Sequence, residues 1–177
     1  TKPWNCVAVV RAQMLPKLPA FGARNLVLLG PSEPPDIHLI AQITADRLRR
    51  AGITVDLQTM DWSSVITRRN VRESPATNPS GWDIAFTLWG GFSLSSPLTN
   101  TPLVTRCDGK NLYGWPCDSE MEKLRAAYFS EISPEGRLKV IDKLQERYFD
   151  VVPYVNTGIF RRYVAFRSNI SGVQKTM

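Results

Sequence analysis

Three cysteines and one histidine are the residues best able to do chemistry in this chain of 177 residues. Cys107 and Cys117 enclose Asp-Gly, Tyr-Gly and Trp-Pro pairs, which favour turns, so the ends of this segment can meet. A zinc site would need a second pair of ligands at short spacing, and His38 lies far away in the sequence. We therefore predict a Cys107–Cys117 disulfide rather than a metal site, and with it an oxidising compartment such as a periplasm. Cys6 is then either buried and free or paired with a residue outside this chain.

The remaining titratable residues do not form a catalytic pattern. The carboxylates lie at expected helix caps or on helix faces, as in Asp36, Asp61, Asp118, Glu120, Glu122 and Glu146. The sequence has no Walker loop, dinucleotide fingerprint or serine-hydrolase elbow, and a single histidine argues against a Ser-His-Asp or Cys-His enzyme. We interpret His38, between Ile37 and Leu39, as a structural or surface residue. We therefore predict no catalytic residue and no cofactor, while an α/β enzyme or an interaction domain remains the alternative of another class.

The composition is that of an ordinary globular protein, with 43% hydrophobic and 21% charged residues. The formal net charge is +6, but the basic residues are scattered and do not alternate with aromatic residues, so no nucleic-acid partner is predicted. No apolar run approaches the ~20 residues that a membrane-spanning helix needs. The first residues, Thr1-Lys2-Pro3-Trp4, lack the shape of a signal peptide, so we expect any export signal to have been removed or to lie outside this chain.

The hydrophobic periodicity from residue 25 onward alternates between strands and helices. It predicts strands at Asn25–Gly30, Ile53–Met60, Trp82–Trp89, Pro153–Ile159 and Tyr163–Arg167, and helices at Asp36–Ala51, Trp62–Arg72, Ser119–Phe129 and Ser133–Val151. Residues 1–24 are left undefined, except that Cys6–Val10 fits a short strand. The order predicts an α/β sandwich with a mixed sheet, in which the first two strands after residue 24 are parallel neighbours.

The helix boundaries follow from capping signals. We expect Asp36 and Asp61 to cap the first two helices, and Ser119 with Glu122 to form a capping box on the third. Pro134 suits the first turn of the last helix. The expected apolar stripe of that helix comprises Leu138, Ile141, Leu144, Tyr148 and Phe149.

Four segments, in this order and spacing, resemble one family. They are Gly52-Ile-Thr-Val-Asp-Leu-Gln-Thr-Met-Asp-Trp62, Gly81-Trp-Asp-Ile-Ala-Phe-Thr-Leu-Trp89, Tyr113-Gly-Trp-Pro-Cys-Asp118, and, after two helices, Val152-Pro-Tyr-Val-Asn-Thr-Gly158. Together they are similar to the C-terminal lobe of the family 5 extracellular solute-binding proteins, the dipeptide/oligopeptide-binding receptors of ABC importers. The resemblance covers residues 25–173. Because members of this family are longer, it implies a fragment in which residues 25–177 belong to the C-terminal lobe and the N-terminal lobe is absent.

The resemblance implies one lobe of a type II periplasmic-binding-protein clamshell. Such a receptor captures a peptide or peptide-like solute between two lobes, delivers it to a membrane permease and does no chemistry on it. The expected location is periplasmic, or extracellular with a membrane anchor, and the full-length form is expected to be a monomer. A nickel chelate, an opine, a sugar or haem is the alternative ligand within the family.

Candidate ligand-binding residues follow from the position of the third predicted strand, because open α/β sheets bind ligands beyond the carboxyl ends of their strands. Trp89 offers a flat wall there, and Gly90 and Gly91 allow close approach of the backbone. The further candidates are Phe92, Ser93, Trp62, Tyr113 and Trp115. Each of these eight has a structural interpretation as well, in the core or in a turn.

Phe92 marks a departure from the family pattern. In typical peptide-binding members, an aspartate three residues after this tryptophan pairs with the α-amino group of the peptide. Here that position is Phe92, and no acidic residue lies between Asp83 and Asp108. Because a buried ammonium without a carboxylate is costly, binding of a free peptide N-terminus at this place is not expected.

Overall fold

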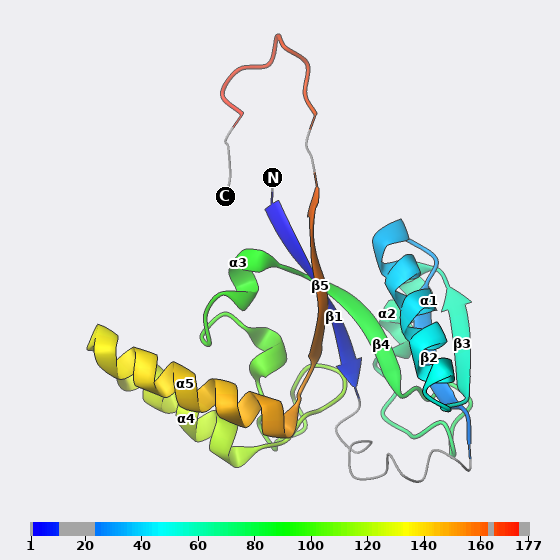
Figure 1. The fold of residues 1–177 in the computed structure, drawn as a ribbon, viewed down its shortest axis with the longest axis horizontal. Helices are drawn as coiled ribbons and strands as arrows, with labels where there is room; N and C mark the ends of the chain where they lie inside the picture. The colour runs from blue at the N-terminus through cyan, green and yellow to red at the C-terminus, as the bar shows by residue number, and fades with distance from the viewer. Residues whose placement is uncertain (1, 11–23, 163–164, 174–177) are drawn as a thin grey trace.

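The computed structural model describes residues 2–10, 24–162 and 165–173 (Figure 1). Its strands are β1 (Lys2–Val10), β2 (Leu26–Pro31), β3 (Val55–Met60), β4 (Ile84–Gly90) and β5 (Val155–Arg162). Its helices are α1 (Pro35–Arg50), α2 (Trp62–Arg68), α3 (Gly91–Leu94), the 3-10 turn η2 (Thr101–Leu103), α4 (Ser119–Ser130) and α5 (Pro134–Val151). The predicted β-α-β-α-β order and the two following helices are therefore confirmed.

The strands form one mixed sheet in the order β3-β2-β4-β1-β5. β2 pairs in parallel with β3 and with β4, which confirms the predicted parallel pair. β1 lies between β4 and β5 and is antiparallel to both. The first part of the undefined segment 1–24 is therefore an inner strand of the sheet, longer than the predicted Cys6–Val10. The side chain of Cys6 lies outside the described residues.

Two apolar cores cover the two faces of this sheet, because successive side chains of a strand point to opposite faces. On one face, α1 packs through Ile37, Ala41 and Ala45 against residues that include Leu28 and Phe86. On the other face, Ala85 and Leu29 pack with Val65 of α2, Tyr113 of the cysteine segment, and Met121 and Leu144 of the pair α4–α5. Figure 1 shows α1 over β2 and β3, and the long pair α4–α5 on the side away from β3.

A buried ion pair joins the starts of β2 and β4. The Asp83 side chain is 1% exposed and accepts hydrogen bonds from both terminal nitrogens of Arg24, at 2.6 and 2.7 Å. The backbone N–H of Val27 also donates to the Asp83 carboxylate, at 2.9 Å. A buried carboxylate is tolerated only when it is paired and hydrogen-bonded in this way. The pair therefore sets where β4 begins alongside β2.

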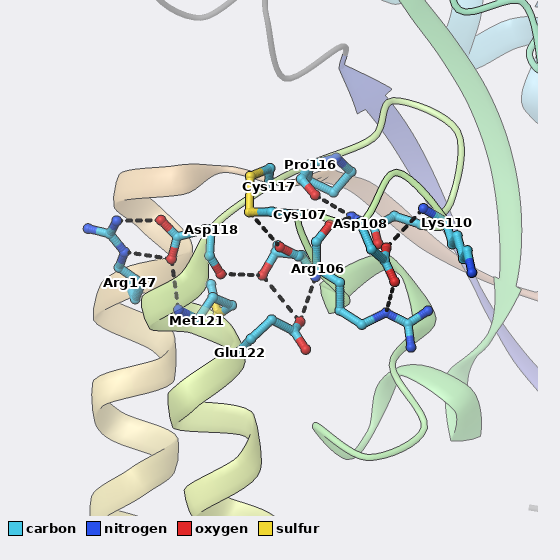
Figure 2. Close-up of a disulfide and its surroundings, with 12 residues drawn as sticks. Arg106, Cys107, Asp108, Lys110, Pro116, Cys117, Asp118, Met121, Glu122 and Arg147 are labelled. Carbon is cyan, nitrogen blue, oxygen red and sulfur yellow. Dashed lines mark hydrogen bonds and ion pairs between the residues drawn. A yellow bond between two sulfur atoms is a disulfide. The ribbon is translucent and has the colours of Figure 1, made fainter.

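The predicted disulfide is confirmed. Cys107 and Cys117 are joined, and Figure 2 shows the bond beside the start of α4 and the end of α5. Within the closed segment, the Asn111 side-chain amide donates to the carbonyls of Arg106 and Pro116, on either side of the two cysteines. The disulfide and the Asn111 bridge hold the segment as one turn, with Tyr113 and Trp115 packed against the core.

Three predicted helix boundaries are wrong. α1 begins at Pro35 after Pro34, and no side chain caps it, because a proline in the first turn has no N–H to satisfy. α4 is capped by Asp118 rather than by the expected Ser119–Glu122 capping box, since the Asp118 carboxylate accepts from the Met121 N–H at 2.7 Å. α2 ends at Arg68, four residues earlier than expected.

Asp61 does cap α2, as predicted, and Pro134 lies in the first turn of α5. The predicted stripe of α5 is only partly right. Leu144 is buried, but Leu138 and Phe149 are 62% and 75% exposed.

The predicted pair of closing strands is wrong in its second member. One strand, β5, covers Val155–Arg162, and residues 165–167 are not in a strand. Residues 163–164 of the expected Tyr163–Arg167 strand lie outside the described part. Residues 165–167 pair with no strand of the described chain.

We predict that Asp83→Asn lowers the free energy of unfolding by about 3 kcal/mol, because it leaves Arg24 without its carboxylate. Urea denaturation of the chain measures this value. Asp46→Asn is the matched control, since Asp46 pairs with Arg50 on the exposed surface of α1 and its loss changes stability by about 0.5 kcal/mol or less. Equal stabilities of the Asp83 and Asp46 variants would contradict the structural role of the buried pair.

We expect the stability of the fold to depend on pH through the carboxyl of Asp118. Hydrogen bonds from Arg147, and then from the Met121 N–H, lower the pKa of Asp118, while its partial burial opposes the shift. Because the folded pKa lies below the unfolded one, the charged carboxylate stabilises the fold above the unfolded pKa of about 4, and this contribution is lost as the pH falls through the folded pKa.

Asp118→Asn keeps a capping side chain but removes the charge. We expect the variant to unfold at a lower temperature than the native chain at pH 7, and the two melting temperatures to converge below about pH 4. Thermal melts followed by circular dichroism from pH 3 to pH 7 measure the difference. A difference that stays constant over this range would show that the ion pair with Arg147 does not stabilise the fold.

Candidate functional site

The strand order creates a topological switch point at the carboxyl ends of β2 and β4. From β2 the chain passes to β3 on one side, and from β3 it returns to β4 on the other side of β2. Ligands of open α/β sheets bind at such a point. Leu29 is opposite Ala85, so the end of β2 at Pro31 is level with Thr87, and β4 continues past it to Trp89 and Gly90. Trp89 therefore lies where a ligand of this sheet is expected.

The side chain of Arg69, which sequence analysis did not single out, lies at this switch point. Its guanidinium carbon is 4.2 Å from the ring centroid of Tyr113 and 5.9 Å from that of Trp62. Its Nη1 donates to the Tyr113 hydroxyl at 3.2 Å and lies 3.5 Å from the Thr87 hydroxyl. Arg69 thus brings together two of the predicted aromatic candidates, from α2 and from the cysteine segment, beside β4.

The environment of Arg69 leaves its positive charge without a carboxylate. Burial raises the pKa of the Tyr113 hydroxyl, with smaller opposing effects from Thr87 and Arg69, so this hydroxyl stays neutral at physiological pH. The Nε atom of Arg69 is buried with no hydrogen-bond partner. In contrast, the guanidinium of the neighbouring Arg68 donates hydrogen bonds to the backbone carbonyls of Pro79, Ser80 and Gly81. Arg68 therefore stabilises the loop that precedes β4.

Trp89 is half-buried against the core on the same face as Thr87. Its indole Nε1 is buried and has no hydrogen-bond partner among the described residues. Gly90 follows with φ of −61° and ψ of 137°, a conformation open to any residue. A Cβ atom on Gly90 would meet only the Ser93 hydroxyl, at 3.8 Å. The protein's own packing therefore does not demand glycine at position 90, and the space in front of this backbone is open.

The other predicted candidates separate into two groups. Gly91, Phe92 and Ser93 form most of the short helix α3, where Phe92 is 84% exposed and Ser93 is half-buried. Trp115 lies elsewhere, since it packs on Trp82 before the start of β4, with 6.2 Å between ring centroids, and under the guanidinium of Arg72 at 5.0 Å. The structure thus gathers Trp62, Tyr113 and Trp89 near the switch point, and it places Trp115 at the opposite end of β4.

A separate cavity of about 260 Å³ lies behind α3. It is lined by the segment 94–103 and by α5, and its polar groups are largely paired with one another. The Asn100 amide donates to the Tyr154 hydroxyl at 3.0 Å, and the Tyr148 hydroxyl donates to the Tyr154 carbonyl at 2.7 Å. Burial raises the pKa of Tyr148 to about 12. This cavity carries no unpaired charge, unlike the switch point.

Other kinds of site were also sought in the described residues. Residues 2–10, 24–162 and 165–173 contain no group of three His, Cys, Asp or Glu side chains that could hold a metal ion. Within the same ranges, every helix is too short or too polar to cross a membrane.

Known proteins similar to this chain share its fold. No protein-family model matches it. The structure of a dipeptide-binding protein from Pseudoalteromonas sp. SM9913, in complex with Met-Leu, superposes with a TM-score of 0.62 over 87% of this chain and 42% of that protein, at 11% identity. The periplasmic binding protein MelB of Agrobacterium fabrum C58, in complex with stachyose, superposes with a TM-score of 0.59 over 77% of this chain and 21% of that protein, also at 11% identity.

A sequence relative extends this likeness beyond the fold. The probable peptide ABC transporter periplasmic-binding protein y4tO of Sinorhizobium fredii is 27% identical over 148 residues. The chain is therefore similar, in sequence and in fold, to part of a periplasmic-binding protein of an ABC transporter. The matched residues make up 84% of this chain, but they span only 27% of that substrate-binding protein. These similar proteins are named as binding proteins rather than enzymes, in agreement with the expectation from the sequence.

Proposed function

We propose that the chain forms one lobe of the periplasmic substrate-binding component of an ABC importer. This component captures a peptide or peptide-like solute between two lobes and delivers it to the membrane permease. The observation that carries the proposal is the contact of Arg69 with Trp62 and Tyr113 at the switch point of the sheet, where β4 ends with Trp89 and Gly90. The sequence relative, which is named as a peptide-binding protein, supports the solute class.

The geometry suits an extended solute. Trp89 offers an aromatic face, and the open space at Gly90 lets a second backbone approach the end of β4. An extended peptide can then place its main chain beside this backbone, as an added strand does, while aromatic side chains contact its side chains. In this proposal Phe92 and Ser93 of α3 lie at the edge of the site, and the exposed Phe92 ring is free to contact the solute or the other lobe.

A sugar is the second candidate solute. It is favoured by the likeness in fold to a protein bound to stachyose, and by the aromatic faces at the switch point, which offer apolar contact area to a pyranose ring as well as to a peptide side chain.

The proposal assigns only one wall of the binding site to this chain. We therefore expect the complete gene product to bind its solute in isothermal titration calorimetry, and the 177 residues alone to bind it at least about a hundredfold more weakly, because half of the contacts are missing. Di- to pentapeptides are the first probes, and stachyose is the sugar probe. Equal affinity of the 177 residues and the complete protein would show that the site is not shared between two lobes.

A variant pair tests whether the switch point is the site. In the complete protein, Trp89→Ala is expected to weaken solute binding about tenfold or more, because it removes an aromatic contact at the centre of the site. Phe129→Ala is the matched control, since Phe129 lies on the outer face of α4 and is 73% exposed. Unchanged affinity in the Trp89 variant, with both variants folded, would place the site elsewhere.

A further inference from the structure

We propose that Arg69 is the anchor for an anionic group of the solute, and that the solute presents a carboxylate to this lobe. This inference rests on the proposed function and narrows its substrate class. The anchor is the guanidinium at the carboxyl end of β2, with the indole N–H of Trp89 as a second donor on the same face of β4.

The guanidinium of Arg69 is fixed in place but only partly used. The ring of Tyr113 supports one face of it at 4.2 Å, and Nη1 is directed to the Tyr113 and Thr87 hydroxyls. Both of these partners are neutral, so neither balances the positive charge. Nη2 has no hydrogen-bond partner among the described residues, and unlike Nε it is not buried. A guanidinium held in place with Nη2 available can donate a charged hydrogen bond to a carboxylate oxygen.

Two acidic residues, at the ends of β4 and α2, are already engaged, whereas Glu33, which follows the end of β2, is exposed. Asp83 is neutralised by Arg24 at the other end of β4. Asp61, at the start of α2, accepts hydrogen bonds from the backbone N–H and the hydroxyl of Ser64, and these bonds lower the pKa of its carboxyl. No Asp or Glu lies between Asp83 and Asp108, which includes the whole of β4 and α3. Beside β4 and α3, the positive charge of Arg69 therefore favours an anionic end of the solute over an ammonium end.

Trp89 adds an unpaired donor to the same place. A buried indole N–H without an acceptor is unfavourable, because it has lost its water without gaining a partner. An oxygen of the solute at the end of β4 removes this cost. Arg69 and Trp89 thus each have a donor atom without a partner among the described residues.

Two peptides that differ only in charge test the inference on the complete protein. N-acetyl-trialanine has a free carboxylate and no amine, and trialanine amide has a free amine and no carboxylate. We expect the acetylated acid to bind about ten- to a hundredfold more tightly than the amide in isothermal titration calorimetry, since charged hydrogen bonds to Arg69 are available only to the acid. Arg69→Gln is expected to abolish this preference, and Arg69→Lys to retain part of it.

Arg72→Gln is the matched control. Arg72 also stacks on an aromatic ring of the cysteine segment, at Trp115, but away from the switch point, so the preference should persist in that variant. Trp89→Phe keeps a ring without the N–H and is expected to reduce the preference several-fold. Because this change leaves Arg69 in place, it tests the site even if the Arg69→Gln variant fails to fold.

The possible failures are distinguishable. Equal binding of acid and amide, or tighter binding of the amide, overturns the carboxylate anchor and leaves peptide capture intact. A preference that survives Arg69→Gln overturns the role of Arg69. If neither peptide binds, the peptide class in the proposed function is wrong, and trigalacturonate against its methyl ester becomes the test. Tighter binding of the acid form, lost in Arg69→Gln, then supports the anchor, and equal binding overturns it.

Discussion

The point at which β2 stops determines the rest of the candidate site. β2 ends at Pro31, which is followed by Ser32-Glu33-Pro34-Pro35, and prolines cannot continue a hydrogen-bonded ladder inside a sheet. β4 has no such residue and continues to Gly90, supported on its other side by β1. The last residues of β4 therefore have a partner on one side only. The strand order produces the switch point, and the earlier end of β2 leaves the last residues of β4 open on that side.

A second constraint fixes the position of the positive charge of Arg69 at the switch point. The disulfide and the Asn111 bridge close the segment between Cys107 and Cys117 into one turn. The turn buries Tyr113 against Trp82, with 6.4 Å between their ring centroids, and the other side of Tyr113 supports Arg69. The Cys107–Cys117 disulfide thus helps to position the Tyr113 ring, and this ring in turn orients the guanidinium of Arg69. On this account the oxidising compartment predicted from the cysteines is also a requirement of the site.

The parts that could be predicted from the sequence are those set by local patterns. Periodicity and turn residues located β2, α1 and β3, and the spacing of turn pairs located the disulfide. Arg69 was missed because, among Arg68, Arg69 and Arg72, it looked like part of a solvated helix face. Only the pairing of β4 with β2, and the fold of the cysteine segment, bring Thr87 and Tyr113 to it. The central position of β1 was missed for the same reason, since its partners Ile84–Gly90 and Val155–Arg162 lie far along the chain.

The central claim is that the solute of this protein lies at the carboxyl ends of β2 and β4. A crystal structure of the complete protein with its bound solute tests this claim most directly. We expect electron density for the solute in contact with the Trp89 ring and the Gly90 backbone, with an oxygen within hydrogen-bonding distance of Arg69. Density in the cavity behind α3, or anywhere that leaves Trp89 and Arg69 without contact, would contradict it.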